Sequence, residues 1–192
     1  MARKLGAKHK LCRRIGEKLC SSAKCPVVRR NFPPGVHGPK GKAKLTEYGV
    51  QLQEKQKAKF IYGILERQFR RYYENAMKKT GDTGVYLVQY LERRLDNVLY
   101  RVGFAQTRAQ ARQGIVHGHV YVNDRRVDRP SYSVRTNDVI RYKKMNKPEK
   151  RELPAWLAVD SKEGNAKIVG APAVDALPER INMRLIIELY SR

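Results

Sequence analysis

The sequence predicts an α+β fold: a helical scaffold domain with an inserted small module of two helices packed on an antiparallel sheet, preceded by an extended basic N-terminal arm. Three observations predict this fold. Apolar residues recur at helical spacing between residues 61 and 102, they alternate at strand spacing after His117, and proline and glycine interrupt the basic first segment. Of the 192 residues, 41% are hydrophobic, which is enough to bury a core.

The distribution of charge indicates the class of partner. The net charge of +23 divides into +12 over residues 1–44, +3 over 45–90, +8 over 91–150 and 0 over 151–192. A compact body with this much self-repulsion is best explained by a polyanionic partner, nucleic acid first and an anionic membrane surface second. No run approaches the roughly 20 apolar residues of a membrane span, and no apolar stretch follows the basic start, so we expect neither membrane insertion nor secretion.

Residues 1–44 are predicted to form the arm, because the prolines and glycines between Pro33 and Gly41 disfavour long helices and strands. The arm would lie along phosphates, and the alternative is a solvated disordered tail. It also carries a candidate metal site, in which two residues separate His9 from Cys12 and four separate Cys20 from Cys25. Four soft ligands in two close pairs suit a tetrahedral structural zinc ion.

Three cysteines cannot all pair within the chain, so we expect a reducing cytoplasmic compartment. The residues alone leave two alternatives open for the arm, a bound zinc ion or free thiols.

Residues 45–90 are predicted to be a helical scaffold, completed by a helix at 179–192. The scaffold pattern is an apolar stripe with a break near Gly63 and a stop at Gly81. The stripe consists of Ile61, Leu65, Phe69, Tyr72 and Ala76. The basic residues on the opposite face, including Lys57 and Lys59, are expected to be mostly solvated. The terminal helix has its own apolar side, which must dock, most plausibly on the scaffold.

Residues 91–150 are predicted to be the inserted module. Its first helix covers 91–102, where a stripe of apolar residues includes Leu95 and Leu99. Thr107 and Gln110 form a capping box for a second helix that ends near Gly114. Strands follow at 117–127, with a turn at Asn123-Asp124, and near 139–142. The neutral segment 151–178 is expected to be irregular connecting structure anchored by Trp156.

Arginine and asparagine recur at helical spacing on the side of the first module helix turned away from its apolar stripe. These residues are Arg93, Asn97 and Arg101. Arg108 and Arg112 do the same on the second helix, so both helices could grip successive phosphates. The alternative is a solvated charged face. His117 and His119 share one strand face and could hold a metal ion, but phosphate contact or packing is the commoner fate of such a pair.

Three stretches of the module closely resemble the RNA-binding module named after the fourth protein of the small ribosomal subunit: RRLDN at 93–97, TRAQARQG at 107–114 and VHGHVYVN at 116–123. Three more resemble the bacterial family of that ribosomal protein: FPPGVHG at 32–38, YGVQLQEKQK at 48–57 and IELYS at 187–191. Together they extend the resemblance over nearly the whole chain.

The resemblance implies a structural ribosomal protein in the cytoplasm. Such a protein binds the five-prime domain of small-subunit ribosomal RNA and nucleates assembly of the subunit body. It lies beside the third and fifth small-subunit proteins, near the channel by which messenger RNA enters, and contributes to translational accuracy. It implies no small-molecule substrate and no membrane partner. The alternative function is an RNA-modifying enzyme or its accessory protein, but the rest of the chain has no paired carboxylates, no nucleophile with a base and no phosphate-binding glycine motif.

The resemblance also implies two sets of RNA contacts. In the module these are Arg93, Arg94, Asn97, Arg108, Arg112 and His117, with Arg125 and Arg126 at the hairpin rim. In the arm they are Arg13, Arg14, Arg29, Arg30, His37 and Lys40. Many relatives carry four cysteines in the arm, whereas this chain places His9 where the first is expected and has a shorter span between the two pairs.

Overall fold

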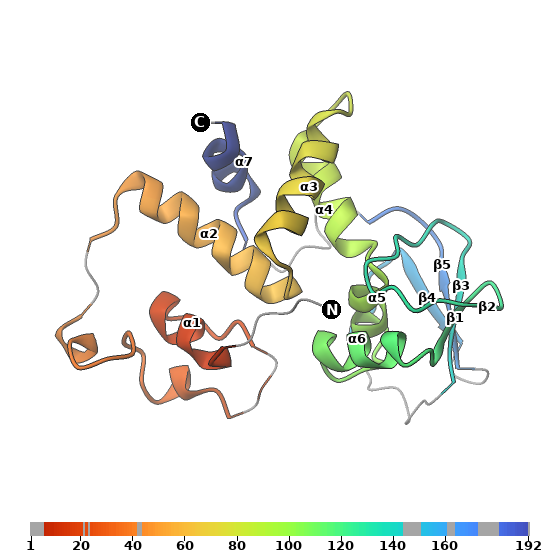
Figure 1. Ribbon diagram of the computed structural model, residues 1–192, viewed down its shortest axis with the longest axis horizontal. Coiled ribbons are helices and arrows are strands. Elements are labelled where there is room, and N and C mark those ends of the chain that lie inside the picture. The colour runs from red at the N-terminus through yellow and green to blue at the C-terminus, as the bar shows by residue number, and fades with distance from the viewer. Residues whose placement is uncertain are drawn as a thin grey trace. The chain divides into compact units, whose positions relative to one another are not determined.

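The structure is a computed structural model that describes residues 6–20, 22, 24–41, 44–143, 151–160, 164–172 and 181–191. Residues 1–71 with 180–192 form one compact unit, and residues 72–179 form a second (Figure 1). The first unit is helical and the second combines helices with one sheet, so the α+β prediction is confirmed. The predicted domain boundaries stay predictions, because a compact unit need not coincide with a domain.

The arm is less extended than predicted. It contains helix α1 (Lys8–Ile15) and two short 3₁₀ helices, η1 (Pro26–Val28) and η2 (Gly38–Lys40). A small core explains this order, because Cys12, Cys25 and Val27 are buried together and Phe60 packs against them. The arm therefore has a folded part, which its proline and glycine content did not indicate.

The scaffold is helical as predicted, although its second helix ends at Met77 rather than at the predicted stop, Gly81. Helix α2 (Glu47–Tyr62) starts at Thr46, whose hydroxyl accepts the N–H of Gly49 at 3.2 Å. It ends at Gly63, which adopts a left-handed conformation with φ 62°, and α3 (Glu66–Met77) follows. The predicted break at Gly63 is therefore confirmed. Glycine suits this position, because a Cβ atom makes the left-handed conformation unfavourable for other residues.

The apolar face of the C-terminal helix is covered as predicted. Helix α7 (Met183–Ser191) packs along α2 (Figure 1), and its Ile186 is fully buried. Tyr190 stacks on Phe69 with ring centroids 6.2 Å apart. Lys57 differs from the expectation of a solvated side chain: it is buried, with its ammonium group 3.2 Å from carboxylates of both Glu17 and Glu54.

Residues 91–102 belong to two helices where one was expected. Helix α4 (Thr83–Glu92) ends before Arg93, and α5 (Leu95–Arg101) begins after Arg94. Arg94 is extended, with ψ 134°, and forms an isolated bridge with Ser133. The prediction of one helix over 91–102 is therefore wrong. The apolar pattern did not reveal the break, because Leu91 before it and Leu95 after it are both buried.

Helix α6 (Arg108–Val116) lies with α5 beside the sheet (Figure 1). Its cap is partly as predicted: the Thr107 hydroxyl accepts the N–H of Gln110 at 3.1 Å, but the Gln110 side chain accepts the N–H of Gln106 at 2.9 Å rather than that of Thr107. The helix start is thus correct and only half of the capping box forms.

The sheet is antiparallel with strand order β2-β1-β3-β5-β4. Its strands are β1 (Val120–Val122), β2 (Arg125–Arg126), β3 (Val139–Tyr142), β4 (Leu157–Asp160) and β5 (Asn165–Ile168). Asn123 and Asp124 connect β1 to β2 with φ values of 48° and 63°, which confirms the predicted turn.

The segment 151–178 was expected to be irregular, and that prediction is wrong for 151–160 and 164–172; the rest of the segment lies outside the described residues. Strands β4 and β5 lie in it and extend the sheet beyond β3. The reason is burial: Trp156, Leu157 and Ile168 join the same core as Leu95 and the other apolar residues of α5 and α6.

Within the described residues, no helix has the length and apolar character that a bilayer crossing needs.

Candidate nucleic-acid interface and metal centre

Two buried carboxylates organise the basic residues of α5 and α6. The first is Glu92, which is fully buried. It accepts the Asn97 amide at 2.8 Å and two bonds from Arg101 at 2.8 and 3.1 Å. The Oδ1 atom of Asn97 in turn accepts Nε of Arg108 at 2.8 Å. Glu92 therefore holds Arg101 directly and Arg108 through Asn97.

The second carboxylate is Asp96, which is 1% exposed. Arg94 binds it through two nitrogens, at 3.0 and 2.8 Å, and Arg112 donates Nε to it at 2.6 Å. Arg94 also donates to the Tyr72 hydroxyl at 2.7 Å. Burial alone lowers the pKa of Arg94, but the charge and hydrogen bonds of Asp96 reverse the effect and raise it above its ordinary value. Arg94 therefore keeps its positive charge inside the unit.

These contacts correct two predicted RNA contacts. Asn97 is fully buried and Arg94 is 6% exposed, so neither side chain can touch RNA in this conformation. Partners supplied by the fold explain the error, because Glu92 covers Asn97, whereas Asp96 and Tyr72 cover Arg94. Asn97 instead positions Arg108, and Arg94 shares the Asp96 carboxylate with Arg112. Arg108 and Arg112 are half-buried at the edge of the network.

Arg151 joins this surface although sequence reasoning did not identify it. Its guanidinium donates to the backbone oxygens of Tyr100 at 2.6 Å and Gln106 at 3.1 Å. It also stacks on the Tyr100 ring at 4.3 Å, and Arg108 lies 4.2 Å from the centroid of the same ring. Arg151 was missed because it is the first residue of a segment with no net charge. The one sequence signal that could have indicated it is the high density of arginine before residue 150.

Most of the remaining predicted contacts lie on the surface. In the module, His117, Arg125 and Arg126 are exposed and Arg93 is half-buried. In the arm, five of the six are exposed: Arg14, Arg29, Arg30, His37 and Lys40. Arg13 instead stacks on Phe32 at 5.0 Å and donates to its backbone oxygen at 3.2 Å, so it fixes the fold of the arm.

The arm also brings the four candidate metal ligands together. The ligand atoms of His9, Cys12, Cys20 and Cys25 all lie within 4.8 Å of one another. Helix α1 places His9 and Cys12 one turn apart, and Cys25 immediately precedes η1. Because a tetrahedral zinc ion with Zn–S bonds of about 2.3 Å holds neighbouring sulfurs roughly 3.8 Å apart, the four residues fit zinc in both chemistry and spacing.

The thiols have different environments. Burial raises the pKa of Cys20 to about 11, with a further contribution from its hydrogen bond to Cys25. Burial also acts on Cys25, but the Val27 N–H and hydrogen bonds from Cys20 and Cys12 outweigh it and lower the pKa of Cys25 below its ordinary value. A backbone N–H donated to a sulfur favours the thiolate, which is the form that binds metals.

Comparison with known proteins adds independent information. The family described as "Ribosomal protein S4/S9 N-terminal domain" matches residues 3–92, and the "S4 domain" matches residues 93–140. "Small ribosomal subunit protein uS4" of Acetivibrio thermocellus is 49% identical over 209 aligned positions that cover all of both chains. "Small ribosomal subunit protein uS4A" of Symbiobacterium thermophilum and the uS4 protein of Pelotomaculum thermopropionicum are each 47% identical, again over the full length of both chains.

Proposed function

Because this chain belongs to the uS4 family of small-subunit ribosomal proteins, we propose that it is a structural constituent of the small ribosomal subunit and binds ribosomal RNA. It acts in the cytoplasm as part of the ribosome. The match covers the whole chain, so the alternative of an RNA-modifying enzyme is not favoured. The observation that carries the proposal is the pair of buried carboxylates, Glu92 and Asp96, which hold Arg101 and Arg112 at the edge of a unit that contains the S4 domain.

The RNA contacts that we propose are those predicted residues that reach the surface or its edge. In the module they are Arg93, Arg108, Arg112, His117, Arg125 and Arg126, and in the arm they are Arg14, Arg29, Arg30, His37 and Lys40. Glu92 and Asp96 spare the module arginines part of the ordering entropy that free side chains lose on binding. Preorganisation of this kind favours a fixed RNA shape over general attraction to polyanions.

The finer assignment follows the family resemblance. We propose that the RNA is the five-prime domain and that binding nucleates assembly of the subunit body. In the subunit the protein would lie beside the third and fifth small-subunit proteins, near the channel by which messenger RNA enters, and contribute to translational accuracy. The +12 charge of residues 1–44 supports an arm that lies along RNA phosphates.

Salt-dependent titration tests the RNA proposal. Neutralising about 6 to 10 phosphates should lower the affinity for five-prime-domain RNA about 10³- to 10⁵-fold between 50 and 200 mM salt. A transcript of another ribosomal RNA domain, of equal length, is the control, and specific binding should exceed it at every salt concentration. A flat salt response, or equal affinity for both transcripts, contradicts the proposal.

We also propose that His9, Cys12, Cys20 and Cys25 hold one structural zinc ion. Zinc would supply a cross-link between α1 and η1, in a segment whose own core is small. Protein purified without added metal should contain about one equivalent of zinc, and Cys20→Ser should reduce that content. A metal-free protein whose arm is equally protease-sensitive with and without chelator would instead support free thiols.

A further inference from the structure

A hollow lies on the second unit between α6 and the end of β3. Its volume is about 260 Å³, and six residues line it: Gln110, Gln113, Gly114, His117, His119 and Tyr142. This volume lies just below the roughly 300 to 1,000 Å³ of typical small-molecule sites. The hollow therefore has room for one small group rather than for a length of chain.

The floor of the hollow is built and rigid. Tyr142 crosses α6 at Gly114, where a Cβ atom would overlap the tyrosine hydroxyl, so only glycine lets the ring lie there. The same ring stacks on Phe104, at 6.5 Å between centroids and 14° between planes. Since Phe104 belongs to the buried core, the position of Tyr142 is fixed by packing.

The walls combine flat rings with amides. The imidazoles of His117 and His119 are stacked, with centroids 6.1 Å apart and planes 23° apart. Gln110 and Gln113 stand on the exposed side of α6, and the Gln110 side chain is oriented by the N–H of Gln106. Flat rings provide stacking surfaces, whereas amides provide both donors and acceptors.

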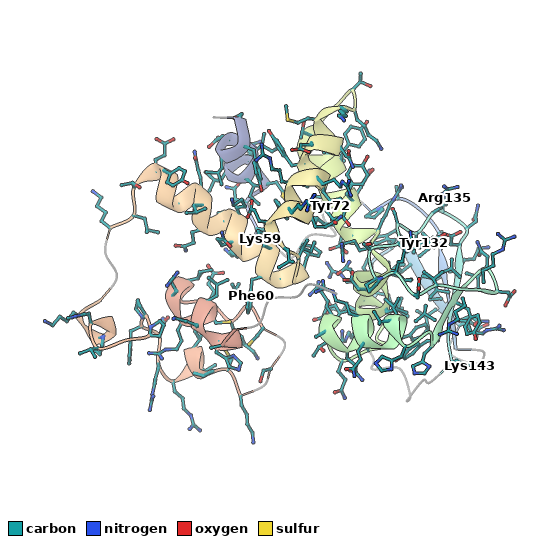
Figure 2. All side chains as sticks on the ribbon, in the orientation of Figure 1. Lys59, Phe60, Tyr72, Tyr132, Arg135 and Lys143 are labelled. Atoms are coloured by element: carbon teal, nitrogen blue, oxygen red, sulfur yellow. The ribbon has the colours of Figure 1, made fainter. Side chains whose placement is uncertain are left out.

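Positive charge flanks the hollow. The Arg126 side chain lies directly over Gly118, where any Cβ would overlap its guanidinium. Lys143, labelled in Figure 2, follows Tyr142, but its ammonium lies on the other face of the sheet, 5.9 Å from the centroid of the Tyr121 ring. The exposed guanidinium of Arg126 is therefore the cation that we place beside the hollow. A ligand seated there would be flat, polar at its edge and joined to an anionic group.

We propose that this hollow holds one unpaired nucleobase of the RNA, an inference that rests on the proposed function and deepens it. The base stacks on the histidine rings, its edge bonds to the glutamine amides, and Arg126 neutralises an adjacent phosphate. The S4 domain thus reads an unstacked nucleotide in addition to the shape of the RNA backbone.

The test compares three single variants of the full-length protein in titrations with five-prime-domain RNA at several salt concentrations and one fixed pH. His117→Ala removes a stacking ring and should weaken binding roughly 5- to 150-fold, without changing the slope of log affinity against log salt. Arg125→Ala removes a phosphate contact and should reduce that slope by about 0.9. Val116→Ala, a 45% exposed neighbour outside the hollow, is the matched control and should bind normally.

Chemical probing supplies the second readout. One unpaired base, protected from dimethyl sulfate by the parent protein, should become reactive with Gln113→Ala and His117→Ala, and both variants should keep the thermal stability of the parent because the two side chains are exposed. Affinity equal to that of Val116→Ala, or a slope reduced by about one for His117→Ala, overturns the base assignment and leaves RNA binding intact. Failure of the parent itself to bind the transcript overturns the proposed function and this inference with it.

Discussion

Replacing Asp96 by asparagine tests whether buried charge holds the RNA-facing arginines. The substitution keeps the side-chain shape, so no cavity forms, but it removes the charge that faces Arg94 and Arg112 and places an amide group among three N–H donors. Breaking a buried ion pair by removing one partner costs about 3 to 5 kcal/mol. We expect a loss in this range, a large share of the roughly 5 to 15 kcal/mol that stabilises most domains.

Arg112→Met is the matched variant, because it removes one charge-assisted bond to Asp96 and leaves the Arg94–Asp96 pair in place. We expect it to cost about 1.5 to 3 kcal/mol, less than Asp96→Asn. Urea unfolding followed by fluorescence of Trp156 suits both variants, since this residue is the only tryptophan and packs in the core of the same unit. If Asp96→Asn loses less than Arg112→Met, the buried charge is not what holds this network.

Three further predictions concern the two units separately. Leu95→Ala should cost about 2 to 5 kcal/mol in urea unfolding, because the side chain is fully buried, and should weaken RNA binding only as the unit unfolds. Gly63→Ala should cost about 1 kcal/mol, measured by thermal unfolding, because the residue has φ 62°; a neutral effect would show that the α2 terminus adjusts. Glu66 has some burial, which raises its pKa, but Lys59, Lys55 and Tyr190 outweigh this and lower the pKa from 4.5 to about 2. The ionised Glu66 therefore stabilises the fold above about pH 4.5, and this contribution is lost as the pH falls toward 2. Glu66→Gln should lower the free energy of unfolding by less than about 1 kcal/mol above pH 4.5, because the group is half-exposed. The difference between the variant and the parent should vanish as the pH falls toward 2.

Local signals explain the elements that were predicted correctly. The left-handed residue at Gly63, the hydroxyl cap at Thr107 and the turn at Asn123-Asp124 each depend on a residue's own conformational preference or on a partner within three positions. The candidate metal ligands of the arm were also identified from local spacing, because His9 lies one helical turn before Cys12 and Cys20 lies close to Cys25 in the sequence. The structure brings the two pairs together. Charge totals over segments also needed no structure, and they indicated the class of partner.

The sequence by itself therefore determined the α+β class, most helix and strand positions, the candidate metal ligands and a polyanionic partner. Only the tertiary structure decided which polar residues face outward. Arg93, Asn97 and Arg101 share one face of an ideal helix, but the buried Glu92 of α4 binds both Asn97 and Arg101, so this face of α5 is covered. The partners that decide this, such as Tyr72 for Arg94 and Tyr100 for Arg151, lie 22 and 51 residues away. Periodicity describes one isolated element, whereas burial of a charge depends on a carboxylate or hydroxyl that another element supplies.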